Sequence, residues 1–134
     1  MGYLRFVLGI NHPDTGLADG VFRTAYTLLD ADEVSKSDRQ ALTDQLAWFS
    51  KNLPAPKRFN RSASKGFYRR KTKGIAWFHD NAQEHISRMH EIKRVLEANG
   101  HVVHIVREVR IGYVVYTDDV QVIAEPFADT RTGP

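Results

Sequence analysis

Apolar and polar residues alternate along the first segment of the chain. Within residues 3–10, every second position is apolar, at Leu4, Phe6, Leu8 and Ile10. A period of two places these side chains on one face of a β-strand. The next stretch, 12–16, contains proline, aspartate and glycine, which favour a turn. The pattern therefore predicts a half-buried strand followed by a turn.

Helical spacing replaces this alternation after residue 17. Over 17–30, Val21, Ala25 and Leu28 lie three or four residues apart. A longer stripe of the same kind follows at Leu42, Leu46, Phe49 and Leu53. Both patterns are typical of amphipathic helices. We expect the two helices to pack as an N-terminal helical hairpin with one shared apolar face.

The second of these helices also has start and stop signals. Ser37 and Gln40 match the reciprocal capping pattern that is found at helix starts. Pro54 and Pro56 cannot continue a helix, because proline lacks a backbone N–H and clashes with the preceding turn. These residues predict a helix over 37–53.

A strand–helix–strand crossover is predicted over 75–109. The apolar run 75–78 and the stretch 101–109 are typical of strands. The helix between them carries an apolar stripe at Ala82, Ile86, Met89, Ile92 and Leu96. Asp80 and Gln83 supply a second capping pair, and Gly100 stands where helices often end in a left-handed residue. The two strands of such a unit are expected to be parallel neighbours with a right-handed connection.

The last segment predicts a β-hairpin, which completes the fold. The apolar run 113–117 is followed by Asp118 and Asp119, which can form a two-residue turn, and by the returning run 120–125. A length of 134 residues and an apolar content of 42% suit one domain. The elements together predict a single α+β domain over 1–134. It has a mixed sheet of about five strands, an N-terminal helical hairpin and one strand–helix–strand crossover.

Charge is distributed unevenly along this chain. The net charge is +3, yet nine lysines and arginines and no acidic residue lie between Gln45 and His79. The rest of the chain contains the other ten basic residues and all sixteen acidic ones. The stretch at about 55–74 has no periodicity and is expected to form a long basic loop. Its basic residues, which we call the basic segment, are Lys57, Arg58, Arg61, Lys65, Arg69, Arg70, Lys71 and Lys73.

Clustered cations interleaved with aromatic rings are typical of surfaces that bind nucleic acid. Lysine and arginine gain affinity for phosphates by releasing counterions, and rings such as Phe59, Phe67 and Tyr68 can stack on bases. No helix-turn-helix signature, zinc-finger spacing or RNP motif accompanies them. A solvated loop is the simpler interpretation of a charge run, so the sequence leaves both interpretations open.

The start of the helix after Asp80 is a second candidate site. Helix N-termini attract anions because their backbone N–H groups are free and the helix dipole is positive there. His79, Glu84, His85 and Arg88 are placed to line a pocket at this position. As a cap, Asp80 would occupy some of these N–H groups and add a negative charge, which weakens the prediction. A glycine-rich phosphate loop is also missing.

Metal and nucleophile chemistry has little support in the sequence. The chain has six histidines and no cysteine, and no two histidines have the spacing of a zincin site. Asp118, Asp119 and Glu125 offer oxygen ligands for a divalent cation, although a hairpin turn already explains the two aspartates. No serine lies in a nucleophile elbow. We expect no metal and no cofactor, and the sequence favours a binding protein over an enzyme.

Two parts of the chain resemble a group of small bacterial proteins that have no assigned function. They are IAWF at 75–78 with AQEHISRM at 82–89, and GYVVYTDDVQVIAEPF at 112–127. The resemblance covers roughly the C-terminal half together with the opening strand. It implies a bacterial or mobile-element source, and it brings no catalytic residues to this chain.

Three functions are therefore expected, in this order. The first is a small accessory or regulatory protein whose basic loop binds nucleic acid or another polyanion. The alternative is an interaction module of the inhibitor or immunity type, which docks on an acidic protein with the basic loop and the hairpin aromatics. The third is a small enzyme with a site near the start of helix 81–99. For the hairpin surface, the aromatic candidates are Trp77, Phe78, Tyr113 and Tyr116.

Location and partners follow from the apolar runs. The first run is too short for the core of a signal peptide, and no later run has the length of a membrane helix. We therefore expect a cytoplasmic protein without a membrane partner. The sequence predicts no particular oligomeric state.

Overall fold

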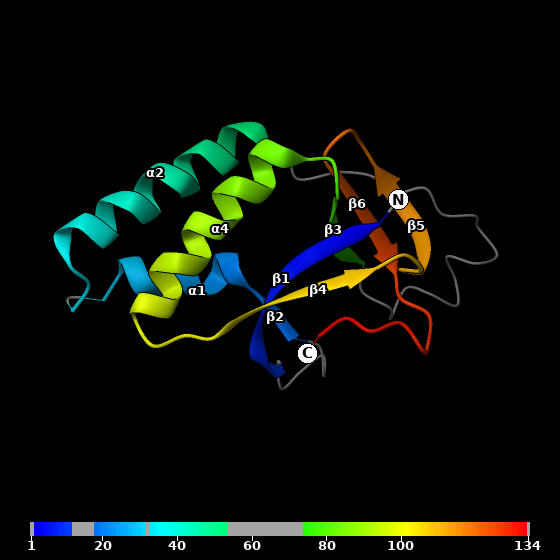
Figure 1. Ribbon diagram of the computed structural model, residues 1–134, viewed down its shortest axis with the longest axis horizontal. Helices are drawn as coiled ribbons and strands as arrows, with labels where there is room; N and C mark the ends of the chain where they lie inside the picture. The colour runs from blue at the N-terminus through cyan, green and yellow to red at the C-terminus, as the bar shows by residue number, and fades with distance from the viewer. Residues whose placement is uncertain (1, 12–17, 32, 54–73, 134) are drawn as a thin grey trace.

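A computed structural model describes residues 2–11, 18–31, 33–53 and 74–133 of the chain. In these ranges it contains three helices and six strands, so the predicted α+β class is confirmed. Figure 1 shows the three helices together on one side of the molecule and the last two strands on the other. The helices are α1 (Val21–Leu29), α2 (Lys36–Asn52) and α4 (Gln83–Ala98). The strands are β1 (Tyr3–Asn11), β2 (Ala18–Gly20), β3 (Ile75–His79), β4 (Val103–Glu108), β5 (Tyr113–Thr117) and β6 (Gln121–Glu125).

Within the described ranges, all strand pairs of the sheet are antiparallel. The strands lie in the order β4, β1, β3, β6 and β5, and β2 pairs with the second half of β1. β3 and β4 run in the same direction because each is antiparallel to β1. The prediction that they are direct neighbours is wrong, since β1 lies between them. β1 has apolar side chains on both faces, which suits this central position.

The N-terminal helical hairpin is present, but the N-cap of α2 lies two residues before the cap that its sequence signals indicated. Ser35 is the N-cap, and its side-chain oxygen accepts a hydrogen bond from the N–H of Asp38 at 3.2 Å. The expected Ser37–Gln40 capping pair is therefore wrong. Arg39 donates to the carbonyl oxygens of Leu29 and, at 2.6 Å, of Ala31. These bonds tie α2 to the end of α1, where free carbonyl groups need donors.

The two ends of α4 differ in how well the sequence predicted them. At the start, Ala82 is the N-cap and makes no side-chain cap bond, so the predicted Asp80–Gln83 pair is wrong. The Asp80 carboxylate instead accepts from the N–H of Gly2 at 2.8 Å. At the other end, Gly100 has a φ of 91° and its N–H donates to Glu97. The predicted glycine terminator is confirmed.

One core lies between the helices and the sheet. Leu4 and Phe6 of β1 project from the sheet into it, and the α4 stripe predicted from the sequence faces them. A fully buried large apolar side chain stabilises a fold by about 1.5–3 kcal/mol, so this core supplies much of the stability. We call it the helix-side core, and its buried members are Leu4, Phe6, Val21, Ala25, Leu42, Leu46, Phe49, Phe78, Met89, Ile92, Val95, Leu96 and Val103.

A second core lies on the opposite face of the same sheet. Tyr3, Arg5 and Val7 alternate with Leu4 and Phe6 along β1 and therefore point to this other face. We call it the far-side core, and its buried members are Val7, Ile75, Trp77, Val106, Ile111, Val122 and Ala124. The sequence did not predict a second core, because short strands with apolar residues on both faces lose their alternation.

A charged side chain is buried on the face that carries the far-side core. Arg5 is 9% exposed, and its guanidinium carbon lies 5.8 Å from the centre of the Trp77 ring. Burial lowers the pKa of Arg5 to about 10, since the charged form loses its hydration. The indole N–H of Trp77 is buried as well and has no acceptor among the residues that the structure describes. This face is thus more polar than the helix-side core.

Candidate functional site

The basic segment lies entirely within residues 54–73, which are outside the described part of the chain. The residues that flank it are described on both sides. α2 ends at Asn52 with Leu53 as its C-cap, and β3 begins at Ile75 after Gly74. The prediction that this segment binds an anion therefore rests on its sequence and on the elements that hold its two ends.

The first of these ends is held by contacts between α2 and α4. Nε2 of His85 lies 2.8 Å from the carbonyl oxygen of Asn52 and must be the donor, because a carbonyl only accepts. The ring centres of His85 and Trp48 are 4.6 Å apart. The guanidinium of Arg88 lies 4.2 Å from the centre of the Trp48 ring. A histidine and an arginine of α4 thus fix the last turn of α2, just before the basic segment.

The second end is held by the hairpin of β5 and β6. In the sheet, Ile75 pairs with Ala124, and Ala124 pairs with Val114. Gly74 packs so closely that a Cβ atom on it would lie 2.7 Å from a methyl group of Ile123. A larger residue would not fit there without movement of Ile123. The chain therefore enters β3 directly against the hairpin.

The four residues of the predicted pocket lie at two separate places. Glu84, His85 and Arg88 are together on α4, where Arg88 forms an ion pair with Glu84 at 3.3 Å. Arg88 also donates to the side chain of Gln45. His79 is elsewhere, with its Nε2 atom 3.1 Å from the Thr117 hydroxyl. The His79 ring packs beside Tyr3, not beside His85.

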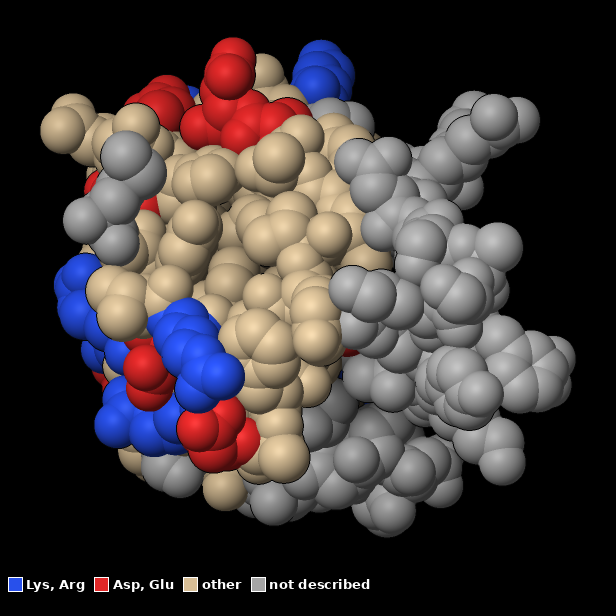
Figure 2. All heavy atoms as spheres, turned by 90° about the vertical axis from the view of Figure 1, so that its right-hand side faces the viewer, with Lys and Arg blue, Asp and Glu red and all other residues tan. Residues whose placement is uncertain are grey.

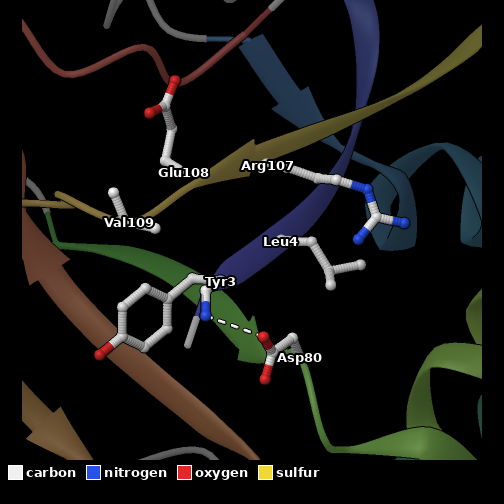
Figure 3. Close-up of a pocket in the computed structure, with 7 residues that line it drawn as sticks. Tyr3, Leu4, Asp80, Arg107, Glu108 and Val109 are labelled. Atoms are coloured by element: carbon white, nitrogen blue, oxygen red, sulfur yellow. Dashed lines mark hydrogen bonds between the residues drawn. The ribbon is translucent and has the colours of Figure 1, made fainter.

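An open pocket of about 360 Å³ lies at the start of β1, where the sequence predicted no site. It is lined by Gly2, Tyr3, Leu4, Asp80, Arg107, Glu108 and Val109. In Figure 3, Arg107 and Glu108 leave β4 in opposite directions, and the dashed line joins Asp80 to the backbone of Gly2. The residues come from three strand ends that only the fold brings together. No short motif in the sequence could have indicated this site.

The turn of the last hairpin explains Asp118, one of its three acidic residues, whereas Glu125 is buried at the end of β6. One Asp118 carboxylate oxygen accepts from the N–H groups of Val120 and Gln121, both at 2.8 Å. The other accepts from the Tyr116 hydroxyl at 2.7 Å. The loop has three residues, 118–120, rather than the predicted two. Within the described ranges, no three metal-binding side chains lie close enough to hold an ion.

One exposed apolar area lies on the hairpin side of the molecule. Tyr113 and Val114 of β5 are 44% and 47% exposed, and the Tyr113 ring lies 5.1 Å from that of Phe127. Figure 2 shows this side, where most of the described surface carries neither acidic nor basic side chains. Trp77 and Phe78, also predicted for this surface, are buried in the two cores. Tyr113 is thus the one exposed side chain of the four predicted aromatics.

Several of the described cations pair with nearby carboxylates. The ion pairs are Arg88–Glu84 at 3.3 Å, Lys93–Glu97 at 2.8 Å, Arg94–Glu91 at 2.7 Å, Arg110–Asp129 at 3.1 Å and Arg131–Glu108 at 3.6 Å. The hydrogen bond from Lys93 lowers the pKa of Glu97, and the hydrogen bond to Glu91 raises the pKa of Arg94. Such exposed pairs contribute little to stability, but they neutralise the cations involved.

Comparisons with protein-family models, with curated proteins and with solved structures found no match. Among the described helices, none is long and apolar enough to span a membrane.

Proposed function

We propose that this chain is a small accessory or regulatory binding protein that engages nucleic acid, or a similar polyanion, through its basic segment. One observation carries the proposal. Residues 54–73 contain eight basic side chains and no acidic one, whereas the rest of the chain contains eleven basic and sixteen acidic ones. A phosphate backbone rewards such local clustering, because each contact releases condensed counterions.

The local ion pairs of the described surface support this proposal. The cations of α4 lie within 3.3 Å of a carboxylate on the same helix, three or four residues away. No acidic residue is available at such spacing within residues 54–73. The basic segment is therefore the part of the chain where positive charge is least compensated by sequence neighbours.

The way in which the flanking residues are held also favours a binding role. His85 fixes the end of α2, and the sheet fixes Ile75 at the start of β3. Binding residues are often carried on connections between the elements of a rigid scaffold. The aromatic residues Phe59, Phe67 and Tyr68 add stacking capacity among the cations.

The test uses fluorescence anisotropy with labelled single- and double-stranded oligonucleotides at low salt. Replacing Arg69, Arg70 and Lys71 by alanine should weaken binding at least about tenfold, since each phosphate contact contributes to affinity. The matched control removes three cations from the described helices, as Arg23→Ala, Lys36→Ala and Arg94→Ala. It should leave binding within about twofold of wild type. No binding by the wild-type protein to either oligonucleotide would end the proposal.

The exposed apolar area favours a second candidate, a protein-interaction module that docks on an acidic protein. Tyr113 and Val114 are exposed, and the Arg110 guanidinium lies 4.4 Å from the centre of the Phe127 ring. Aromatic and arginine side chains are enriched at interface cores. Pull-down from native cells, with and without nuclease, separates the two functions. Partners that remain after nuclease treatment favour the interaction module.

The third candidate, a small enzyme at the start of α4, has less support. Glu84, His85 and Arg88 are each engaged by neighbouring groups, and His79 lies apart from them. Activity would require these contacts to open when a substrate binds. Together with the nucleic-acid function, we propose that the protein is cytoplasmic and comes from a bacterium.

A further inference from the structure

The two outer strands of the sheet differ in regularity. β5 pairs with β6 through a register shift between Val114 and Tyr116. Such bulges help to prevent an edge strand from pairing with another chain. β4 pairs with β1 at six consecutive positions, from Val103 opposite Leu8 to Glu108 opposite Tyr3, without a shift. β4 is thus a regular edge, and Figure 1 shows it beside β1 at the border of the sheet.

The outer edge of β4 carries backbone groups that pair with no other strand among the described residues. The N–H of Val103 lies 3.5 Å from a carboxylate oxygen of Glu97 and is therefore turned away from β1. In an antiparallel strand, alternate residues direct both N–H and C=O to the same side. Ile105 and Arg107 consequently direct their backbone groups outward as well. Among the described strands, β4 pairs with β1 alone.

Most of β4 lacks the features that protect an edge strand. It contains no proline, lysine or bulge, and its two charged residues, Arg107 and Glu108, both lie at its C-terminal end. Val102 and Val109, on either side of the strand, are 62% and 72% exposed. A regular edge with exposed apolar residues at both ends is suited to accept a further strand.

We propose that β4 pairs antiparallel with β4 of a second copy of this chain, across a two-fold axis at Val106. Since Ile105 and Arg107 carry the outward groups, a symmetric pairing must place odd-numbered residues opposite each other. With the axis at Val106, Ile105 lies opposite Arg107 of the partner subunit. The two-fold symmetry repeats this contact, so that Arg107 lies opposite Ile105 of the partner subunit. The pairing forms about four backbone hydrogen bonds at these positions.

Side-chain complementarity selects this register among the symmetric ones. It places His104 opposite Glu108 of the partner subunit, twice in the dimer, where a ring N–H of the imidazole can donate to the carboxylate. Arg131 of the same chain lies 3.6 Å from one Glu108 oxygen, which leaves the other oxygen for this bond. Moving the axis to Arg107 would place two arginines opposite each other, and moving it to Ile105 would separate His104 from the carboxylate. Opposite charges on facing strands are stabilising and like charges are destabilising. Two-fold dimers are also the commonest form of symmetric assembly.

The first test combines mass measurement with a charge swap. Wild-type protein at several hundred micromolar should run as a dimer in size-exclusion chromatography with light scattering. His104→Glu and Glu108→Lys should each shift the chain toward monomer, because the first places two carboxylates opposite each other and the second removes the acceptor of the His104 imidazole. A mixture of the two variants should form dimers again, since a heterodimer contains a Glu–Lys pair and a His–Glu pair. Glu33→Lys, an exposed change away from β4, serves as the control and should leave the mass unchanged.

The second test determines the register. The chain has no cysteine, so a single introduced cysteine reports one contact. Val106→Cys should cross-link to its own copy under mild oxidation, because opposite residues lie within disulfide range. Ile105→Cys should cross-link much less, since Ile105 lies opposite Arg107 of the partner subunit. A monomeric wild type would overturn the proposal, as would a mixture that stays monomeric while both variants remain folded. Preferential cross-linking of Ile105→Cys would overturn the register.

Discussion

The two faces of the sheet are closed by different means. On the helix side, three amphipathic helices bury thirteen side chains, all of them apolar. On the far side, seven buried apolar residues share the face with Arg5, and the β5–β6 hairpin contributes part of the cover. The helix-side core depends on a repeated pattern that many residues share. The far-side core depends on single residues that shape one hairpin.

Two residues illustrate this dependence on single positions. Gly112 has a φ of 121°, and a Cβ atom there would lie 2.0 Å from the carbonyl oxygen of Glu125. No side chain fits such an approach, so glycine is required. Asp118 accepts hydrogen bonds from two backbone N–H groups of the hairpin turn. In the helix-side core, the loss of stability on substitution should therefore depend on how deeply the residue is buried. In the hairpin, it should depend on the backbone geometry at the substituted position.

The largest expected effect comes from a charge in the helix-side core. Met89 is 2% exposed, and Met89→Asp should lower the free energy of unfolding by about 4 kcal/mol, because it buries an unpaired carboxylate. Ser87→Asp, on the exposed side of the same helix, should change it by less than about 0.5 kcal/mol. Urea unfolding measures both. A Met89→Asp variant as stable as wild type would show that α4 presents another face to the sheet.

A smaller effect is expected from a methyl group at Gly112. Gly112→Ala should cost about 3 kcal/mol, since it combines a left-handed backbone with a clash against the main chain at Glu125. Gly100 also has a positive φ, 91°, but a Cβ atom added to it would have no neighbouring atom within 4 Å, which makes Gly100→Ala the matched control. It should cost about 1 kcal/mol. Equal melting temperatures for the two variants would contradict the close approach at Gly112.

The smallest effect concerns the turn and depends on pH. Burial alone raises the pKa of Asp118, but hydrogen bonds from Gln121, Tyr116 and Val120 outweigh it, so the pKa lies below its ordinary value. Asp118→Ala should cost about 1–2 kcal/mol near neutral pH. A depressed carboxyl pKa stabilises the fold above the unfolded pKa, and this contribution disappears as pH falls through the folded pKa. The difference from wild type should therefore shrink below about pH 4.

The neighbouring aspartate provides the control for this prediction. Asp119 is exposed, and Asp119→Ala should change stability by less than about 0.5 kcal/mol at any pH. Thermal unfolding across a pH series measures both variants. A constant difference between Asp118→Ala and wild type, from acidic to neutral pH, would show that the carboxylate does not stabilise the turn.

The parts of the fold that the sequence predicted are those that rest on a period. The stripe of α4, including Met89, Ile92 and Leu96, gave both the helix and its buried face. Long-range pairing has no such local pattern. The place of β1 between β3 and β4 depends on contacts between residues that are distant in the sequence, so the predicted neighbours were wrong.

Caps and candidate sites were harder to predict for the same reason. Several residues near a helix start can serve as caps, and tertiary contacts decide among them. Asp80 is an example, because it binds Gly2 of β1 instead of capping α4. His79 and His85 lie close in sequence but on opposite faces of the sheet. His79 packs beside Tyr3 on the far side, and His85 packs beside Phe78 on the helix side. The charge of the basic segment, by contrast, is a property of composition and could be read directly.

The most direct test of the proposed function is the salt dependence of binding to a labelled oligonucleotide. For wild type, the logarithm of the affinity should fall linearly with the logarithm of the salt concentration, because cations of the basic segment displace counterions from phosphates. Replacing Arg69, Arg70 and Lys71 by alanine should flatten this slope by up to about three, roughly one for each lost contact. The control variant at Arg23, Lys36 and Arg94 should keep the wild-type slope. A triple variant that stays folded and shows the same slope as wild type would contradict the proposal.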